Sequence, residues 1–311
     1  MKKLAIIGNA KAGKGNLSQL FLEARRLIWG WPCDFLTPSS TADLTSVCTS
    51  LDPDVYEAAV VIGGDGTIHH AVRGLAQGKI PLYAFPGGTA NDLASELGTR
   101  ADWGQVQQLI NERQPESIDL IDVNGVPFST VAGVGLGASL TEDFNQRRQS
   151  SPLFKAAATA FKSQVYTLLS VRTICMNWGK SRSIHVESGS FSEKIKTSAI
   201  FVCNQARLGG DLTVGHGVTN NDQRLDVLII PRASGLSMMQ ALLALKKGVF
   251  PEDFICLSSS HVRLTDTRGE DLSVFGDGET LISSSTLDFK ILPSHLNVYS
   301  AREKKARVVH E

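Results

Sequence analysis

The sequence predicts two domains, an α/β domain with a parallel sheet followed by a mainly antiparallel β-sandwich domain. The chain has 311 residues, which is long enough for about two domains. Up to about Ile121, short apolar runs alternate with helical patterns, which is typical of a parallel sheet covered on both faces. Beyond that point the apolar runs follow one another closely, as antiparallel strands do. We therefore expect domains at 1–122 and 123–290, with 291–311 as a C-terminal segment returning to the first domain.

Four apolar runs in the first domain are expected to be strands. They are Leu4–Ile7, Phe35–Leu36, Val60–Ile62 and Leu82–Phe85. Each is followed by a turn and a helix-like stretch, the first of which covers about residues 17–28. Ligands of such sheets bind at the carboxyl ends of the strands, so the loops at these ends are the candidate binding sites.

The second domain is expected to be built largely from strands, with two helical patches. The strands are predicted at Phe128–Val131, Ser183–Glu187, Thr197–Val202, Leu225–Ile230, Val262–Leu264, Leu272–Phe275 and Leu287–Ile291. The helical patches are predicted at Leu153–Ser170 and Gly235–Lys247.

Composition excludes some classes of protein. Lys plus Arg and Asp plus Glu both number 31, and this balance argues against a dedicated nucleic-acid binder. No apolar run approaches the ~20 residues that span a bilayer, so membrane contact is expected to be peripheral. The 5 cysteines are scattered without metal-binding spacing, which favours a reduced, cytoplasmic protein.

The strongest local signal is a glycine-rich loop after the predicted strand Val60–Ile62. It reads Gly63-Gly64-Asp65-Gly66-Thr67 and opens a predicted helix. Loop amides and a helix N-terminus together can bind an anion such as phosphate. Asp65 would repel that phosphate unless a divalent cation lies between them. The alternative is that Asp65 only caps the helix, but capping alone does not need flanking glycines.

Two further loops and one buried carboxylate repeat this logic. The segment 9–15 follows the first strand with two glycines and two lysines, and an ordinary helix entry explains it about as well. The segment 85–93 contains Gly87, Gly88, Thr89, Asn91 and Asp92 at the next strand end. Asp119 lies at the start of the following apolar strand, where a buried carboxylate needs a partner. Carboxylates near phosphate-binding loops suggest a nucleotide with Mg²⁺.

Gly63–Thr67 together with Gly88-Thr-Ala-Asn-Asp92 resembles the diacylglycerol kinase catalytic-domain family, which includes bacterial diacylglycerol kinases and sphingosine kinases. The resemblance spans nearly the whole chain, in family order. Its other motifs are Asn9…Gly13-x-Gly15, Gly133–Gly137, Asn204…Gly209-Gly210, Asn221-Asp222…Leu225-Asp226 and Gly276-Asp277-Gly278-Glu279. Ala10 stands where the family usually has proline.

This resemblance implies roles for particular residues, with the active site in the cleft between the two domains. It implies ATP as phosphoryl donor, in contact with Asn9, Thr37, Gly63, Gly64, Asp65, Gly66, Thr67, Gly88, Thr89 and Asn91. It implies Mg²⁺ held by Asp65, Asp92 and Asp119, and a general base in Asp277, assisted by Glu279. Some bacterial members hold a second metal where Thr219, Asp222 and Arg224 lie here, but Gln223 replaces the usual glycine and puts that site in doubt.

The resulting prediction is a lipid kinase that transfers the γ-phosphoryl group of ATP to a lipid hydroxyl, with diacylglycerol as leading acceptor. Phosphoryl transfer needs phosphate positioning, charge neutralisation and a group that takes the hydroxyl proton, and these motifs supply each. An NAD kinase, which shares the glycine-rich turn, and a catalytically silent lipid- or nucleotide-binding protein are the alternatives. Taken alone, Phe275–Glu279 would be a plain hairpin turn.

One long segment is a candidate for contact with a membrane. Residues 144–186 contain no Asp or Glu, but seven Lys and Arg interleaved with apolar side chains. Such a stretch can lie on an anionic membrane, and a core-packed helix with a solvated basic face is the equal alternative. The helix around Met238–Lys247 is a second candidate for acyl-chain contact, with core packing favoured. A homodimer is an assembly that the sequence leaves open.

Overall fold

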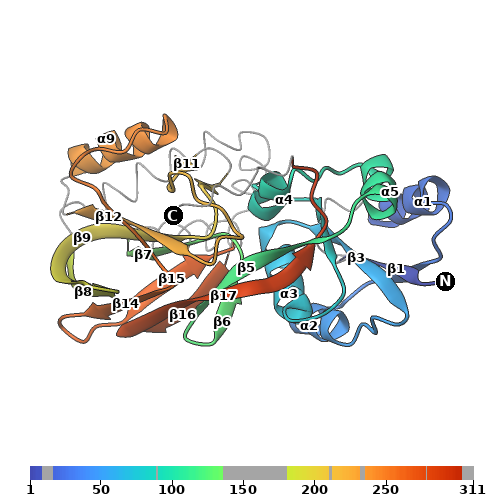
Figure 1. Cartoon of the computed structure of the whole chain (residues 1–311), viewed down its shortest axis with the longest axis horizontal. Coiled ribbons are helices and arrows are strands. Elements are labelled where there is room, and N and C mark those ends of the chain that lie inside the picture. Colours follow the sequence, from blue (N-terminus) through green and yellow to red (C-terminus); the bar gives the residue numbers. More distant parts are fainter. Residues whose placement is uncertain are drawn as a thin grey trace, which may run out of the picture. The chain divides into compact units, whose positions relative to one another are not determined.

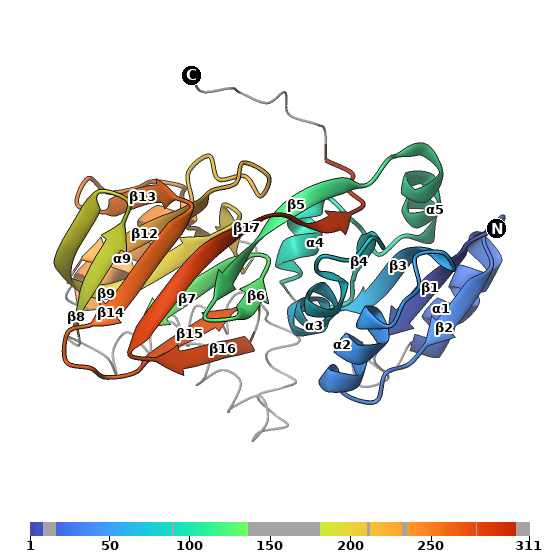
Figure 2. The same ribbon diagram turned by 60° about the horizontal axis from the view of Figure 1, so that its bottom comes forward.

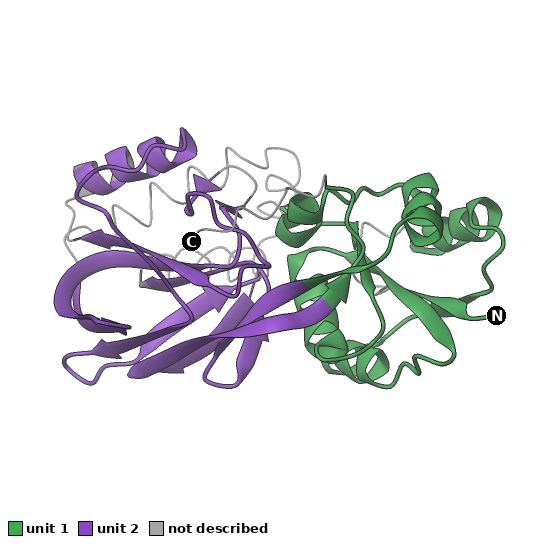
Figure 3. Ribbon diagram, viewed as in Figure 1, with its two compact units in different colours: residues 1–117, 297–311 green, residues 118–296 purple. Residues whose placement is uncertain are grey.

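A computed structural model of the protein describes residues 1–8, 17–88, 90–135, 181–209, 212–231, 235–277 and 279–302. The chain divides into two compact units, which Figure 3 colours separately. Unit 1 contains residues 1–117 and 297–311, and unit 2 contains residues 118–296. The chain thus enters unit 2 after Ser117 and comes back to unit 1 at Asn297.

Unit 1 is an α/β domain built on a parallel sheet with the strand order β2-β1-β3-β4. Its elements are β1 (Lys3–Gly8), α1 (Leu17–Leu27), β2 (Cys33–Leu36), α2 (Thr41–Thr49), β3 (Tyr56–Gly63), α3 (Asp65–Leu75), β4 (Leu82–Pro86), α4 (Asp92–Leu97) and α5 (Trp103–Glu112). The four strands predicted for the first domain are confirmed, and each extends beyond the predicted run. The last strand of the chain, β17 (Thr286–Val298), ends in parallel pairing with β4 at Val298 and Leu82.

Helices cover both faces of this sheet, α1 and α5 on one face and α2 and α3 on the other (Figure 1). Strand β3 is apolar without alternation from Ala58 to Ile62 because each of its faces is covered. On the α1–α5 face, Ile6, Val60 and Phe85 pack with Trp103. The parallel strands all end at one edge of the sheet, so the loops after β3 and β4 emerge side by side.

Unit 2 is an antiparallel β domain with the strand order β16-β15-β7-β9-β8-β14-β17, with β12 and β13 added to β9 and with β5 and β6 beside β17. Figure 2 shows β8, β14 and β17 running side by side. Its elements are β5 (Glu116–Val123), β6 (Val126–Phe128), β7 (Val131–Gly135), β8 (Arg182–Ser188), β9 (Phe191–Cys203), β10 (Arg207–Leu208), β11 (Leu212–Thr213), β12 (Leu225–Pro231), α9 (Gly235–Lys246), β13 (Ile255–Ser259), β14 (His261–Asp266), β15 (Leu272–Gly276), β16 (Glu279–Ser284) and most of β17.

Two apolar cores stabilise unit 2. Alternate residues of its strands, such as Val202, Val262 and Phe289, form the larger core. The second core lies under α9, whose Met238 and Leu245 pack against Phe201 and other apolar residues. Core packing, the favoured interpretation of the α9 sequence, is therefore confirmed for these two side chains. Along the described chain, none of the helices has the length and apolarity needed to cross a bilayer.

One predicted strand is wrong. The run Phe128–Val131 is interrupted by a turn at Ser129 and Thr130, which separates β6 from β7. Their main-chain N–H groups donate to the carboxylate of Asp277 instead of to a neighbouring strand. The predicted helix at 153–170 and the acid-free part of the chain up to residue 180 lie outside the described residues.

Candidate functional site

The glycine-rich loop lies where strand β3 gives way to helix α3. Gly64 is the N-cap of α3 in an extended conformation, and because it has no side chain it makes no side-chain cap hydrogen bond to the helix. Asp65 is the first helical residue, so it does not cap α3, and the capping alternative is wrong for this helix. The helix N-terminus with its flanking glycines keeps the geometry of an anion site.

The loops after β3 and β4 pack main chain against main chain. The N–H of Gly87 donates to the carbonyl of Gly63 over 2.8 Å. A β-carbon on Gly88 would lie 2.5 Å from Cα of Gly64, and one on Gly63 would lie 2.4 Å from the Thr67 side chain. Gly88 is therefore required for the two loops to approach each other, and Gly63 is required for Thr67 to pack against its own loop.

Asp65 fastens the second loop to the first. Its carboxylate accepts hydrogen bonds from the main-chain N–H groups of Asn91, over 3.0 Å, and Asp92, over 2.6 Å. Asn91 has a left-handed conformation, with φ of 53°, and uses its side-chain oxygen to bind the N–H of Gly88 rather than to cap α4. Asp65 thus satisfies two N–H groups at the start of α4 that the helix itself leaves unpaired.

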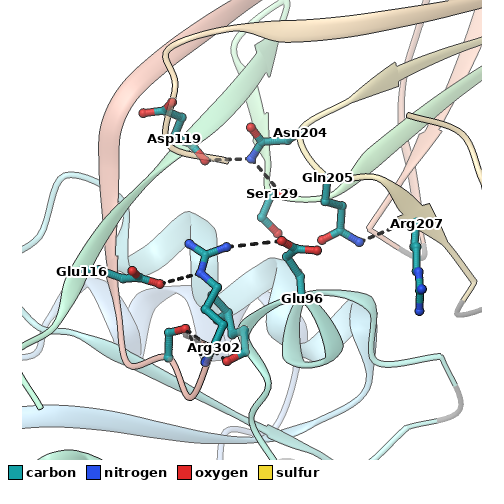
Figure 4. Close-up of polar contacts among 10 residues, drawn as sticks. Glu96, Glu116, Asp119, Ser129, Asn204, Gln205, Arg207 and Arg302 are labelled. Carbon is teal, nitrogen blue, oxygen red and sulfur yellow. Dashed lines mark hydrogen bonds and ion pairs between the residues drawn. The ribbon is translucent and has the colours of Figure 1, made fainter. Parts of the chain in front are cut away.

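The other end of α4 is held by the C-terminal segment of unit 1. Figure 4 shows Arg302 between Glu96 of α4 and Glu116 of β5, at 3.2 and 2.9 Å. The N–H of Ala301 also donates to the carbonyl of Leu97, the last residue of α4, over 2.8 Å. Both ends of this short helix are consequently fixed by residues distant in sequence.

The remaining residues predicted for nucleotide binding are only partly described. Thr37 follows β2 at the edge of the sheet where β3 and β4 also end, and it is exposed. Gly66 and Thr67 lie in the first turn of α3. Asn9 and Thr89 lie outside the described residues. The structure therefore brings together Gly64, Asp65, Gly88, Asn91 and Asp92.

Asp119 belongs to unit 2 and has protein partners for both carboxylate oxygens. It is 1% exposed and accepts hydrogen bonds from the N–H groups of Gln223 and Ser294, each over 2.7 Å. Burial raises the pKa of Asp119, and these two donors oppose that effect. Gln223 and Ser294 both have left-handed backbones, with φ of 64° and 50°. Asp119 therefore joins the turn at Gln223 and a left-handed position within β17 to β5.

The loop predicted to hold a second metal is closed by protein contacts. The carboxylate of Asp222 accepts the N–H of Arg224 over 3.0 Å, and the Arg224 side chain binds Ser258 through its hydroxyl and carbonyl. Gln223, at the position of the family glycine, adopts the left-handed conformation that glycine favours. Thr219 is half-buried beside this loop. Metal binding at this loop stays a prediction.

Asp277 is the most heavily bonded carboxylate among the predicted residues. It is 5% exposed, directly follows β15, which pairs with β16, and has φ of 49°. One oxygen accepts the N–H and hydroxyl of Ser129 over 2.9 and 3.1 Å. The other accepts the N–H of Thr130 over 2.9 Å and its hydroxyl. Asp277 thus follows the first strand of a hairpin, as its sequence suggests, and also has a carboxylate whose orientation is fixed by hydrogen bonds.

Sequence reasoning missed Ser129 and Thr130. Both are buried, at 1% and 3% exposure, in a segment predicted to be a strand. Two adjacent hydroxyl residues within an apolar run were the available signal, since buried hydroxyls need partners. Glu279, the second predicted acceptor-side carboxylate, begins β16 and is half-buried.

The predicted magnesium ligands are carboxylates, as Mg²⁺ prefers. Within the described ranges no three His, Cys, Asp or Glu side chains come together as a ready-made metal site. Mg²⁺ at a nucleotide usually needs only one or two carboxylates, because phosphate oxygens and water complete its shell. Asp65 is a carboxylate of the kind that this lesser requirement calls for, at the N-terminus of α3.

Comparisons with known proteins agree on both parts of the chain. Residues 3–123 match the diacylglycerol kinase catalytic domain, and residues 151–300 match the YegS C-terminal NAD kinase beta sandwich-like domain. A diacylglycerol kinase of Bacillus subtilis (strain 168) is 23% identical over 313 residues, covering 98% of each chain. A protein of Pseudomonas syringae pv. tomato named "Probable lipid kinase YegS-like" is 26% identical, covering 87% of this chain and 84% of its own.

Solved structures share the fold. Two crystal structures from Bacillus anthracis str. Sterne, described as "a putative diacylglycerol kinase" and "a diacylglycerol kinases", align with TM-scores of 0.77 and 0.70 at 20% and 18% identity. Each alignment covers 96% of this chain and 97% of the other. At this identity the likeness concerns the fold, and it agrees with an α/β domain followed by a β-sandwich domain.

Proposed function

Because this chain belongs to the family of kinases that carry the diacylglycerol kinase catalytic domain, we propose that it transfers the γ-phosphoryl group of ATP to the hydroxyl group of a lipid. Diacylglycerol is the leading acceptor, and phosphatidic acid the product. The relative from Bacillus subtilis that covers nearly the whole chain is named for this acceptor. Selectivity between lipids depends on the acceptor pocket, so the assay below includes several acceptor classes.

The loops after β3 and β4 are the proposed nucleotide site. Gly64 and Gly88 bring the two loops into main-chain contact, and Asp65 locks the start of α4 to the start of α3. This arrangement supports phosphate binding because the N–H groups at the start of α3 are directed away from the helix body at the sheet edge. We assign Asn9, Thr37, Thr67, Thr89 and Asn91 to the same site on the resemblance of their motifs.

Mg²⁺ bound with the nucleotide would neutralise phosphate charge. We propose Asp65 and Asp92 as its carboxylates, with Asp119 as the third member that the family resemblance implies. The buried contacts of Asp119 support a structural role for it as well. The second metal at Thr219, Asp222 and Arg224 is likewise kept as a proposal.

Asp277 is the proposed group that takes the proton of the lipid hydroxyl, with Glu279 beside it in sequence. The observation that carries the proposed function is the orientation of this buried carboxylate by four donors from Ser129 and Thr130. Two of the four donors are hydroxyls, which can rotate away. An incoming substrate hydroxyl can then replace one of them at the same oxygen and give up its proton there.

Access to a lipid implies contact with a membrane surface. We propose a cytoplasmic protein that associates peripherally with anionic membranes, with the acid-free segment 144–186 as the contact. Charge reversal at Arg147, Arg148 and Lys155 is expected to weaken binding to anionic vesicles, and unchanged binding would rule this segment out. A homodimer remains a candidate assembly for the active form.

The experiment that tests the proposed function uses labelled ATP and Mg²⁺ with diacylglycerol, sphingosine, ceramide, phosphatidylglycerol and NAD as separate acceptors. We expect transfer to a lipid and a loss of about 100-fold or more in kcat on Asp277→Asn. Glu279→Gln is run in parallel to separate the two carboxylates. Transfer to NAD alone would make the protein an NAD kinase, and full activity of the Asp277→Asn variant would remove the base assignment.

A further inference from the structure

Asn204 connects two elements that flank the predicted base. Its side-chain Nδ2 donates to the main-chain carbonyls of Asp119, over 2.8 Å, and Ser129, over 2.9 Å (Figure 4). Its main-chain N–H donates to the carbonyl of Thr130 over 2.8 Å. Asn204 itself is fully buried and directly follows β9 (Phe191–Cys203). Three donors from one residue thus hold strand β5 and the Ser129–Thr130 turn together.

The same turn is bound from its other side by Asp277. Carbonyl groups of Ser129 and Thr130 accept from Asn204, while their N–H and hydroxyl groups donate to Asp277. The turn has no regular strand pairing of its own, because it lies between β6 and β7. Its position, and with it the direction of the Asp277 carboxylate, therefore depends on these two partners.

Among uncharged side chains of this size, only a carboxamide can make the observed bridge. One nitrogen must supply two hydrogen atoms to two carbonyl oxygens, which Ser, Thr and Asp side chains cannot do. Within the described residues, the oxygen of this carboxamide is buried and has no hydrogen-bond partner. A buried acceptor without a hydrogen bond lowers the stability of the fold, so Oδ1 does not explain why an asparagine stands here. The bridge made by its nitrogen is the compensating contribution.

We propose that Asn204 is a positioning residue for phosphoryl transfer, acting through the Ser129–Thr130 turn to orient Asp277. The proposal rests on the proposed function, because it assigns Asn204 to the same reaction. Without the bridge Asp277 is still present, but the Ser129–Thr130 turn that orients its carboxylate is less firmly held. The rate of transfer then falls while nucleotide affinity, which depends on loops of unit 1, is kept.

Asn124 is a matched control. It is another asparagine of unit 2 whose side chain ties a turn to a strand, because its Nδ2 donates to the carbonyl of Thr286 and its Oδ1 accepts the N–H of Asp288, both in β17. It lies in the turn between β5 and β6, at the opposite end of β6 from Ser129. Asn124→Ala removes a comparable bridge without touching the partners of Asp277.

The test compares Asn204→Ala, Asn204→Ser and Asn124→Ala in the full-length chain, with the lipid found to be phosphorylated by the unmodified protein. For Asn204→Ala we expect kcat to fall by about tenfold or more, with KM for ATP within about twofold. Asn204→Ser keeps one donor and serves as the second variant if the alanine variant does not fold. Asn124→Ala is expected to lower Tm but to keep kcat within about twofold.

A double variant separates positioning from a general loss of structure. If Asn204 acts through Asp277, Asn204→Ala added to Asp277→Asn lowers the rate by less than about threefold further. The proposal would be overturned if the rate loss of the double variant equalled the product of the two single losses. It would also be overturned if Asn204→Ala and Asn124→Ala had equal kcat values.

Amide hydrogen exchange gives a readout that needs no activity. The Ser129 and Thr130 amides are expected to exchange about tenfold faster or more in Asn204→Ala than in the unmodified protein, and to be unchanged in Asn124→Ala. Unchanged exchange in Asn204→Ala would overturn the proposed positioning. If no lipid is phosphorylated by the unmodified protein, the proposed function fails, and the exchange result still decides whether Asn204 positions this turn.

Discussion

The carboxylate of Asp65 accepts a 2.6 Å hydrogen bond from the main-chain N–H of Asp92, 27 residues later in the chain. This contact joins the first residue of α3 to the first residue of α4. A side chain expected to face phosphate or metal thus also holds together the two loops that are proposed to bind the nucleotide. Both uses are compatible, because a carboxylate can accept about four hydrogen bonds or metal contacts.

Asp65→Asn is expected to lower the free energy of unfolding by about 1–2 kcal/mol. Its new NH₂ group would face a main-chain N–H of Asn91 or Asp92, where the carboxylate now accepts. Urea denaturation measures the loss. Asp102→Asn is the control, since Asp102 caps α5 through one hydrogen bond and asparagine caps a helix equally well. Equal stability of both variants would contradict this role of Asp65.

Gly88→Ala is expected to destabilise unit 1 by about 2 kcal/mol or more and to weaken ATP binding. The added methyl group would lie 2.5 Å from Cα of Gly64, and neither main chain can yield without separating the loops. Thermal unfolding and nucleotide titration measure the two effects. In the control Gly104→Ala, the methyl group would meet only the carboxylate of Asp102, at 3.2 Å, so nucleotide affinity should be unaffected.

Gln223→Gly is expected to raise the free energy of unfolding by about 0.5–1 kcal/mol. Gln223 has φ of 64° and an exposed side chain, so glycine relieves left-handed strain and removes no buried contact. Its N–H continues to donate to Asp119. Chemical denaturation measures the gain, and a loss of stability would show that the glutamine side chain contributes more than the strain costs.

Asp288 is expected to make the free energy of unfolding depend on pH. Burial raises its pKa, but the hydrogen bonds and charges of Lys290 and His261 outweigh burial and hold the pKa of Asp288 at about 2. Because this pKa lies below the ordinary value of 3.8, the contribution of the carboxylate is present above that pH and is lost as the pH falls toward 2.

The measurement compares the unmodified protein with Asp288→Asn. At pH 7 the variant is expected to be less stable by about 1 kcal/mol, since the ion pairs of Asp288 are partly exposed. The difference should shrink as the pH is lowered below about 4. A difference that stays constant across that range would mean that the charge of Asp288 does not contribute.

The local pattern of the sequence was sufficient to predict elements whose conformation depends on residues close to them in the chain. The apolar runs around Val60 and Leu82 predicted parallel strands because continuous burial on two faces leaves an unbroken apolar signature. The glycine-rich loop after β3 was predictable for a similar reason, since its backbone requirements are local. The family of the chain was evident from the order of such motifs, and both domain matches agree with it.

Only the tertiary structure decided which partner each polar group has. Ser129 and Thr130 were predicted to be strand residues because their neighbours are apolar, but their N–H groups meet Asp277, 148 and 147 residues away in sequence. Asp119 meets Gln223 and Ser294 in the same way. Hydrogen bonds between residues so far apart in the sequence leave no periodic pattern in it. Residue types therefore predicted which carboxylates are candidates for the site. Only the fold determined which groups each carboxylate binds.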